Sequence, residues 1–108
     1  MIPKAGEKGK GGRELVDEGK RLIITVLGYD QIGIIASIAN ICAETNINIL
    51  DISQTILQGF FTMVMVVDSN AANVDISEFR ERIISKGKEL NLQVSIQHED
   101  IFKFMHRI

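Results

Sequence analysis

The segment Gly28-Tyr-Asp-Gln-Ile-Gly33 has residue types and a position that could bind a small polar ligand. It joins an aliphatic run, typical of a strand, to a segment with helical periodicity. Free backbone N–H groups at a helix start attract carboxylates, and Asp30 beside them could accept hydrogen bonds from an ammonium group. These features together would suit a zwitterion such as an amino acid. A simpler alternative is that Asp30 only caps the helix and the glycines only form a turn.

A phosphate site at the same segment is not expected. The spacing of Gly28 and Gly33 matches the start of a P-loop, in which a lysine and a hydroxyl residue follow the second glycine. Ile34 and Ile35 stand at those two positions. The segment therefore offers no cation for phosphates and no hydroxyl for Mg²⁺.

Other reactive side chains do not form a recognisable catalytic or metal-binding set. Cys42 is the only cysteine, which excludes an internal disulfide and a multi-thiolate metal site, and it lies on an apolar helical stripe typical of a buried structural residue. The spacing of His98 and His106 matches no standard zinc pattern, so we interpret that end of the chain as solvated. We expect no enzyme activity, no catalytic residue, no metal and no cofactor.

The periodicity of apolar residues predicts the elements that position these groups. They are a strand over 21–27, a helix over 33–45, a strand over 47–57, a strand over 60–67, a helix that Asp75 opens and Asn91 ends, and a strand over 92–97. This β-α-β-β-α-β order predicts an α+β, ferredoxin-like sandwich, with a four-stranded antiparallel sheet and both helices on one face.

Individual residues mark the ends of these elements. Asn46 is a candidate left-handed helix stop, and Gln58-Gly59 predicts a tight turn between two antiparallel strands. Asp75 and Glu78 have the spacing of a capping box. Residues 100–108 have one apolar helical face, which predicts a short C-terminal helix that must dock on its own sheet or on a partner.

Residues 1–20 are expected to be a flexible extension, because this glycine- and lysine-rich stretch has too little apolar surface to offset its ordering entropy. Residues 21–108 form the single predicted domain. The formal net charge of −2 and the lack of a long apolar run give no reason to expect a nucleic-acid or membrane partner. A cytoplasmic location fits the single cysteine and the absence of a signal-peptide pattern.

The strand over 60–67 is apolar on both faces. Phe60, Val64 and Val66 lie on one face, and Phe61, Met63, Met65 and Val67 lie on the other. Helices on one side of the sheet would leave the first set exposed. The C-terminal segment, a second copy of the chain, or both must cover it, and we expect a homodimer or a higher oligomer.

The same element order occurs in RNA-recognition motifs, but the residues do not support RNA binding. The stretch Gln58-Gly-Phe-Phe-Thr-Met-Val-Met65 lacks the basic first position of that motif. Ile23 stands where the first strand would need a stacking ring. Without rings and basic charge, RNA binding loses its main sources of energy.

Three segments resemble the ACT domain, a regulatory module with the predicted topology. Thr25-Val-Leu-Gly-Tyr-Asp-Gln-Ile-Gly-Ile-Ile-Ala36 is similar to the strand, glycine loop and helix start of that family. Asn46-Ile-Asn-Ile-Leu-Asp51 is similar to its passage from helix to strand, and Phe104-Met-His-Arg-Ile108 looks like the ending of small standalone ACT proteins of bacteria and archaea, an uncharacterised family. Ile32 stands where many members have proline.

The resemblance implies a sensor of an amino acid or related metabolite that regulates another protein. In the family, ligands sit at the interface between paired domains and contact the first loop and the start of the second strand. Carried over to this chain, the ligand-binding positions are Gly28, Asp30, Gln31, Gly33, Ile34, Asn46, Ile47 and Asn48. The alternative is a ligand-free assembly module that uses its apolar sheet face to bind another protein.

Overall fold

The computed structural model of the protein describes residues 21–100. The predicted extension over 1–20 and the predicted C-terminal helix therefore lie outside the described residues, apart from the helical backbone of Glu99 and Asp100. No helix in the described part is long and apolar enough to cross a membrane.

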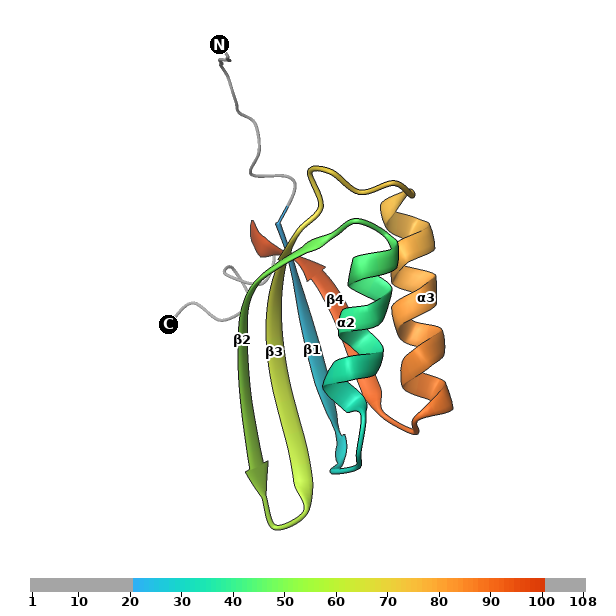
Figure 1. Ribbon diagram of the computed structural model, residues 1–108. Coiled ribbons are helices and arrows are strands. Elements are labelled where there is room, and N and C mark those ends of the chain that lie inside the picture. The colour runs from blue at the N-terminus through green and yellow to red at the C-terminus, as the bar shows by residue number, and fades with distance from the viewer. Residues whose placement is uncertain (1–20, 101–108) are drawn as a thin grey trace.

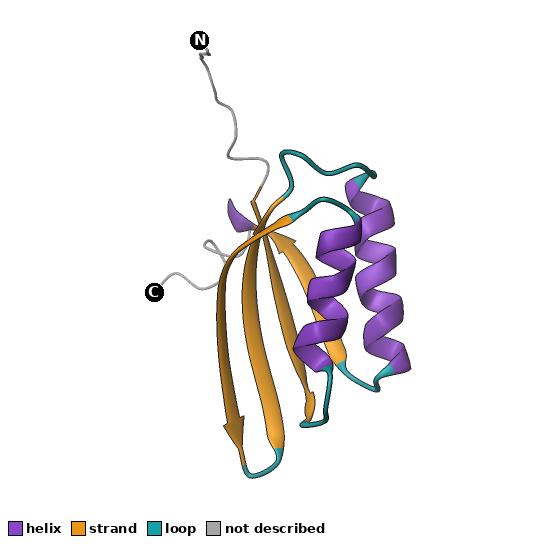
Figure 2. Cartoon of the chain, in the orientation of Figure 1, coloured by secondary structure: helices purple, strands orange, loops and turns teal. Residues whose placement is uncertain are grey.

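Six elements follow one another in the predicted order, as Figure 1 shows. They are β1 (Arg21–Tyr29), α2 (Ile34–Glu44), β2 (Asn48–Leu57), β3 (Phe60–Asp68), α3 (Ile76–Glu89) and β4 (Gln93–His98). The strands form one antiparallel sheet in the order β2-β3-β1-β4, and both helices cover the same face (Figure 2). The ferredoxin-like prediction is confirmed.

The strand register assigns each side chain to a face of the sheet. Ile24 pairs with Met65, which pairs with Ile52, so these residues share the helix-covered face. Thr25 pairs with Val64 and with Ser95, and these residues share the opposite face. We call this second face the open face. A bulge between Ile49 and Asp51 keeps the apolar residues of β2 in phase with the core.

The core lies between the sheet and the helices. In α2, Ile34, Ile38, Ile41 and Cys42 are buried and Ile35 packs against them, which confirms the predicted stripe. The innermost side chains come from β1, β3, α2 and α3 and are Ile24, Val26, Ile38, Met63, Met65, Val67, Phe79 and Ile83. Burying aliphatic and aromatic side chains of this kind contributes about 1.5–3 kcal/mol each to stability.

Local turn chemistry explains where the elements end. Asn46 and Asn91 follow the two helices with φ of 59° and 60°, as the left-handed stops predicted from the sequence require. Gln58 and Gly59 have φ of 53° and 84°, so the β2–β3 turn has positive φ at both central residues, the geometry of a type I′ hairpin. This hairpin extends beyond the helices (Figure 1).

Both predicted side-chain caps are wrong. Asp75 occupies the N-cap of α3, but its side chain makes no cap hydrogen bond, and Glu78 instead accepts a hydrogen bond from Arg82 at 2.7 Å. Glu78 and Arg82 are four residues apart, a spacing at which side chains of opposite charge pair on a helix surface. The N-cap of α2 is Gly33, so Asp30 does not cap that helix.

Candidate functional site

The end of β1 and the loop after it contact the backbone of the β2–β3 turn on one side and Leu92, just before β4, on the other. β1 continues to Tyr29, two residues beyond the predicted end, because pairing with β3 extends to Phe60. The Asp30 N–H then donates to the Gly59 carbonyl at 2.8 Å. A Cβ atom at Gly28 would lie 2.5 Å from Leu92 Cδ2, so a glycine permits this close approach.

The start of α2 offers unpaired backbone donors. Gly33 is its N-cap with φ 92°, a left-handed conformation that favours glycine, and no side chain caps the helix. The Ser37 N–H donates to the Gly33 carbonyl at 2.9 Å. The amides of Ile34, Ile35 and Ala36 precede that first helical hydrogen bond and have no acceptor within the helix. The first turn contains no acidic residue that would oppose an anion.

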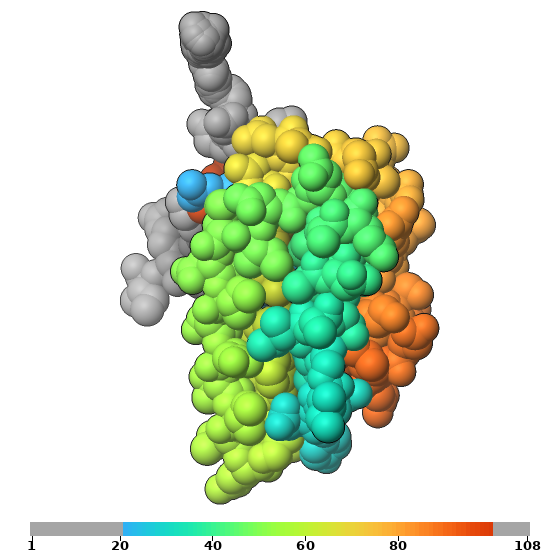
Figure 3. Space-filling view, in the orientation of Figure 1, coloured from blue at the N-terminus to red at the C-terminus, as the bar shows by residue number. Residues whose placement is uncertain are grey.

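A cavity of about 260 Å³ lies between this loop and the β2–β3 hairpin. It is lined by Asp30, Gln31, Gly33, Ile34, Ile35, Ala36, Gln54, Ile56 and Phe61. Its aliphatic and aromatic walls and its single carboxylate, on the exposed Asp30, suit a small ligand with an apolar part and a positive group. Figure 3 shows the hairpin lying uncovered beside α2.

The Gln31 side chain, predicted to bind ligand, makes a structural contact instead. Gln31 Nε2 donates to the Leu90 carbonyl at 2.8 Å, so this side chain satisfies the C-terminal end of α3. Ile32 is fully exposed at the loop tip. Gln31 therefore fixes the loop against α3 and is also one of the residues that line the cavity.

The second predicted group, Asn46 to Asn48, surrounds a separate cavity of about 220 Å³. Asn46 Nδ2 donates to the Ala71 carbonyl at 2.8 Å, and the Ile47 N–H donates to the Cys42 carbonyl at 2.8 Å. Ile47 is buried in the core, whereas Asn48 is exposed at the start of β2. Asn46 and Asn48 are both exposed, but within the described residues only the Asn46 side chain already has a hydrogen-bond partner.

The two predicted groups do not meet within one chain. They lie at opposite ends of α2, whose 11 residues span about 16 Å. Gln54, Ile56 and Phe61 line the first cavity and were not identified from the sequence. The tight Gln58-Gly59 turn was the available signal, because it fixes the register that carries these residues back to the loop.

Comparisons with known proteins identify the family. The family model of the ACT domain matches residues 20–97. A protein of Methanosarcina acetivorans named UPF0237 protein is 50% identical over 88 residues, which are 82% of this chain and 96% of the relative. The chain belongs to the ACT domain family.

Solved ACT structures have the same fold. The ACT domain protein from Streptococcus pneumoniae is 40% identical with a TM-score of 0.67, and the match covers 79% of this chain and 96% of that protein. The regulatory subunit of aspartate kinase from Thermus thermophilus is 22% identical with a TM-score of 0.59, over 75% of this chain and 52% of that one. The first match and the archaeal relative also place this ACT domain among small standalone proteins.

Cys42, the only cysteine of this ACT domain, has an unreactive thiol. Cys42 is 1% exposed on the inner face of α2, and burial raises the pKa of its thiol from 9.0 to about 11. A thiol that stays protonated is a poor nucleophile and a poor metal ligand. Residues 21–100 contain no group of three His, Cys, Asp or Glu side chains that could hold a metal ion.

Proposed function

We propose that this protein is a regulatory ACT domain that binds an amino acid or a closely related metabolite between two copies of the chain and acts on another protein. Family membership supports the general role, since ACT domains are typically regulatory ligand-binding modules of amino-acid metabolism. The single cysteine, buried and unpaired, suits the reducing cytoplasm, which is the location we propose.

The observation that carries the proposal is the combination of Asp30 with the uncapped start of α2. The free amides of the first turn suit a carboxylate. The Asp30 carboxylate, exposed on the loop three residues before the Gly33 N-cap, suits an ammonium group. Ile34, Ile35 and Ile56 line the same cavity and suit an aliphatic side chain.

A second copy of the chain would complete this site. β2 is an edge strand, and its residues from Leu50 to Leu57 are exposed. Its start lies at the Asn48 cavity, whereas Gln54 and Ile56 near its end line the Asp30 cavity. Antiparallel pairing of two such edges would set the start of one strand against the end of the other. Asn48 of one protomer would then face the Asp30 loop of its partner.

A thermal-shift panel of the twenty amino acids tests the proposal on the full chain. A ligand at ten times its Kd stabilises the native state by about 1.4 kcal/mol, which raises the Tm of a domain this size by roughly 6–11 °C. We expect Asp30→Ala and Asn48→Ala each to remove the shift. Asp75→Ala and Asn40→Ala are matched controls outside both cavities and should keep it.

The alternative of a ligand-free assembly module keeps one specific support, the apolar patch on the open face. Leu27, Tyr29, Leu57 and Phe60 are large side chains between 47% and 68% exposed on that face. A panel without any shift would favour this alternative. A shift that survives both Asp30→Ala and Asn48→Ala would place the ligand elsewhere on the domain.

A further inference from the structure

We propose that the open face of the sheet is a second self-association surface, on which a second copy of this chain docks face to face. In the alternative of a ligand-free assembly module, this second copy would be the protein that binds the open face. The inference does not depend on ligand binding. The face lies on the side of the sheet opposite the helices (Figure 2), whereas the proposed ligand site lies beside α2.

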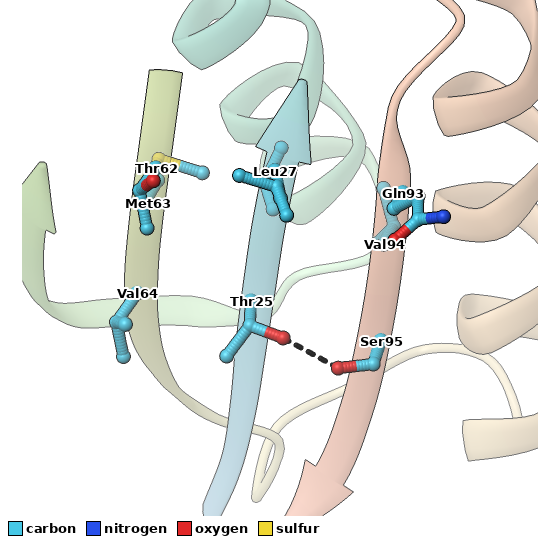
Figure 4. Close-up of a pocket in the computed structure, with 9 residues that line it drawn as sticks. Thr25, Leu27, Thr62, Met63, Val64, Gln93, Val94 and Ser95 are labelled. Atoms are coloured by element: carbon cyan, nitrogen blue, oxygen red, sulfur yellow. Dashed lines mark hydrogen bonds between the residues drawn. The ribbon is translucent and has the colours of Figure 1, made fainter. Parts of the chain in front are cut away.

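The open face combines a protruding aromatic pair with a neighbouring hollow. Tyr29 and Phe60 stack with ring centroids 5.0 Å apart and planes 21° apart, and they are 67% and 48% exposed. The hollow, of about 530 Å³, is centred on Thr25 and its strand neighbours (Figure 4). It is lined by Thr25, Val26, Leu27, Thr62, Met63, Val64, Gln93, Val94 and Ser95.

This arrangement fits a copy of itself. Tyr29 follows Thr25 by four strand residues, which is about 13 Å. A two-fold axis between the two features would place the aromatic pair of each copy in the hollow of the other. Such an isologous contact uses the same patch twice, as most homodimers do. A hollow of this volume is within the range of pockets that enclose small molecules, about 300–1,000 Å³, so it has room for side chains.

The chemistry of the face also favours a second copy over a charged partner. From Thr25 to Tyr29 on β1, and at the open-face positions paired with them, no described residue is charged. The polar groups there are hydroxyls and an amide, on Thr25, Thr62, Ser95 and Gln93. These groups both donate and accept hydrogen bonds, so they can pair with copies of themselves, which carboxylates and ammonium groups cannot. Thr25 and Ser95 already share a hydrogen bond (Figure 4).

The area of the open face sets an upper limit on the size of this interface. The strands contain nine, ten, nine and six residues. At about 3.3 Å per residue and about 4.8 Å between strands, their face has a planar footprint of about 540 Å². Two copies in full overlap would cover about 1,100 Å². An axis between Thr25 and Tyr29 leaves the Arg21 ends of the two sheets outside the contact, while projecting side chains add area to the part that overlaps. A specific interface needs about 1,000 Å² or more.

The first test measures the mass of the full chain by light scattering over a range of concentrations. We expect Leu27→Arg and Thr25→Arg, which place a guanidinium in the hollow, to weaken one association step at least about 100-fold, because docking would bury this charge where the lining offers no carboxylate to pair with it. Ser77→Arg adds the same charge to an exposed position on α3 and should leave the mass unchanged. Circular dichroism checks that each variant folds.

The second test detects contact directly with a short thiol crosslinker. Tyr29→Cys and Thr25→Cys proteins are mixed, and we expect crosslinked pairs of unlike chains in excess over either variant alone. The buried Cys42 thiol provides the unreactive background. A wild-type chain that stays monomeric at high concentration would overturn the inference. Arginine variants with the same mass as the wild type would also overturn it, and so would a mixture of the two cysteine variants without excess crosslinks.

Discussion

At the residue scale, the side chains of the proposed site differ in whether they already have a hydrogen-bond partner. Gln31 and Asn46 donate to the Leu90 and Ala71 carbonyls, so binding a ligand through these amides would break a structural contact. Asp30 and Asn48 are exposed and have no such contact within the described residues. These two residues are therefore the better choices for substitutions that test ligand binding without loss of fold.

Cys42 gives a prediction for the dependence of stability on pH. Because burial raises the pKa of its thiol from 9.0 to about 11, the folded state holds this proton more tightly than the unfolded chain does. The resulting stabilisation is complete below pH 9.0 and is lost as the pH rises toward about 11. We expect the free energy of unfolding of the wild type to fall, relative to Cys42→Ala, by on the order of 2 kcal/mol across this window.

Urea denaturation of both proteins at several alkaline pH values measures this difference. Lysine and tyrosine titrations occur in both proteins, so the difference isolates the thiol. Parallel pH profiles would show that Cys42 has the same pKa in the folded and unfolded states.

At the element scale, the β2–β3 hairpin determines the shape of the ligand cavity, and its turn can be improved. Gln58 has φ 53°, a left-handed conformation that asparagine adopts more readily than glutamine. Asn-Gly is the preferred pair for a type I′ turn. We expect Gln58→Asn to raise the free energy of unfolding by about 0.5–1 kcal/mol, measured by urea denaturation.

Gln93→Asn is the matched control for this substitution, because Gln93 lies at an extended position at the start of β4. Asparagine is disfavoured in strands, so this variant should be no more stable than the wild type. Equal gains at both positions would show that the effect does not come from the turn.

The fold could be predicted from the sequence because each element has a strong local signal. The 3–4 residue spacing of Ile34, Ile38 and Ile41 and the Gln58-Gly59 turn gave the correct topology. The side-chain caps could not be predicted, since Glu78 had two possible partners and spacing alone does not choose between the backbone and Arg82. The walls of the ligand cavity were missed in part because Ile56 reaches the loop only through strand pairing.

At the scale of the whole molecule, the two proposed contacts use different surfaces of one small sheet. The edge of β2 would join two chains side by side, and the open face would join them face to face. The two contacts use different residues. A chain that uses both would form an assembly larger than a dimer, with two kinds of two-fold interface.

These separate surfaces predict that a bound amino acid strengthens only one of the two contacts. A ligand held between Asp30 of one chain and Asn48 of another binds the edge-paired state and not the separated chains, so by linkage it must stabilise that state. We expect the amino acid with the largest thermal shift, at 100 times its Kd, to tighten edge pairing up to about 100-fold for each bound ligand. Sedimentation with and without that amino acid measures the change.

Variants on each surface separate the two effects. Ile52 is 38% exposed on the helix side of β2, and Ile52→Arg should abolish both edge pairing and the response to the amino acid. Leu27→Arg, on the open face, should lose face-to-face association and keep the ligand-dependent step. If the amino acid instead tightens association equally in both variants, its site does not lie across the β2 edge. If the response to the amino acid does not depend on protein concentration, the whole site lies within one chain.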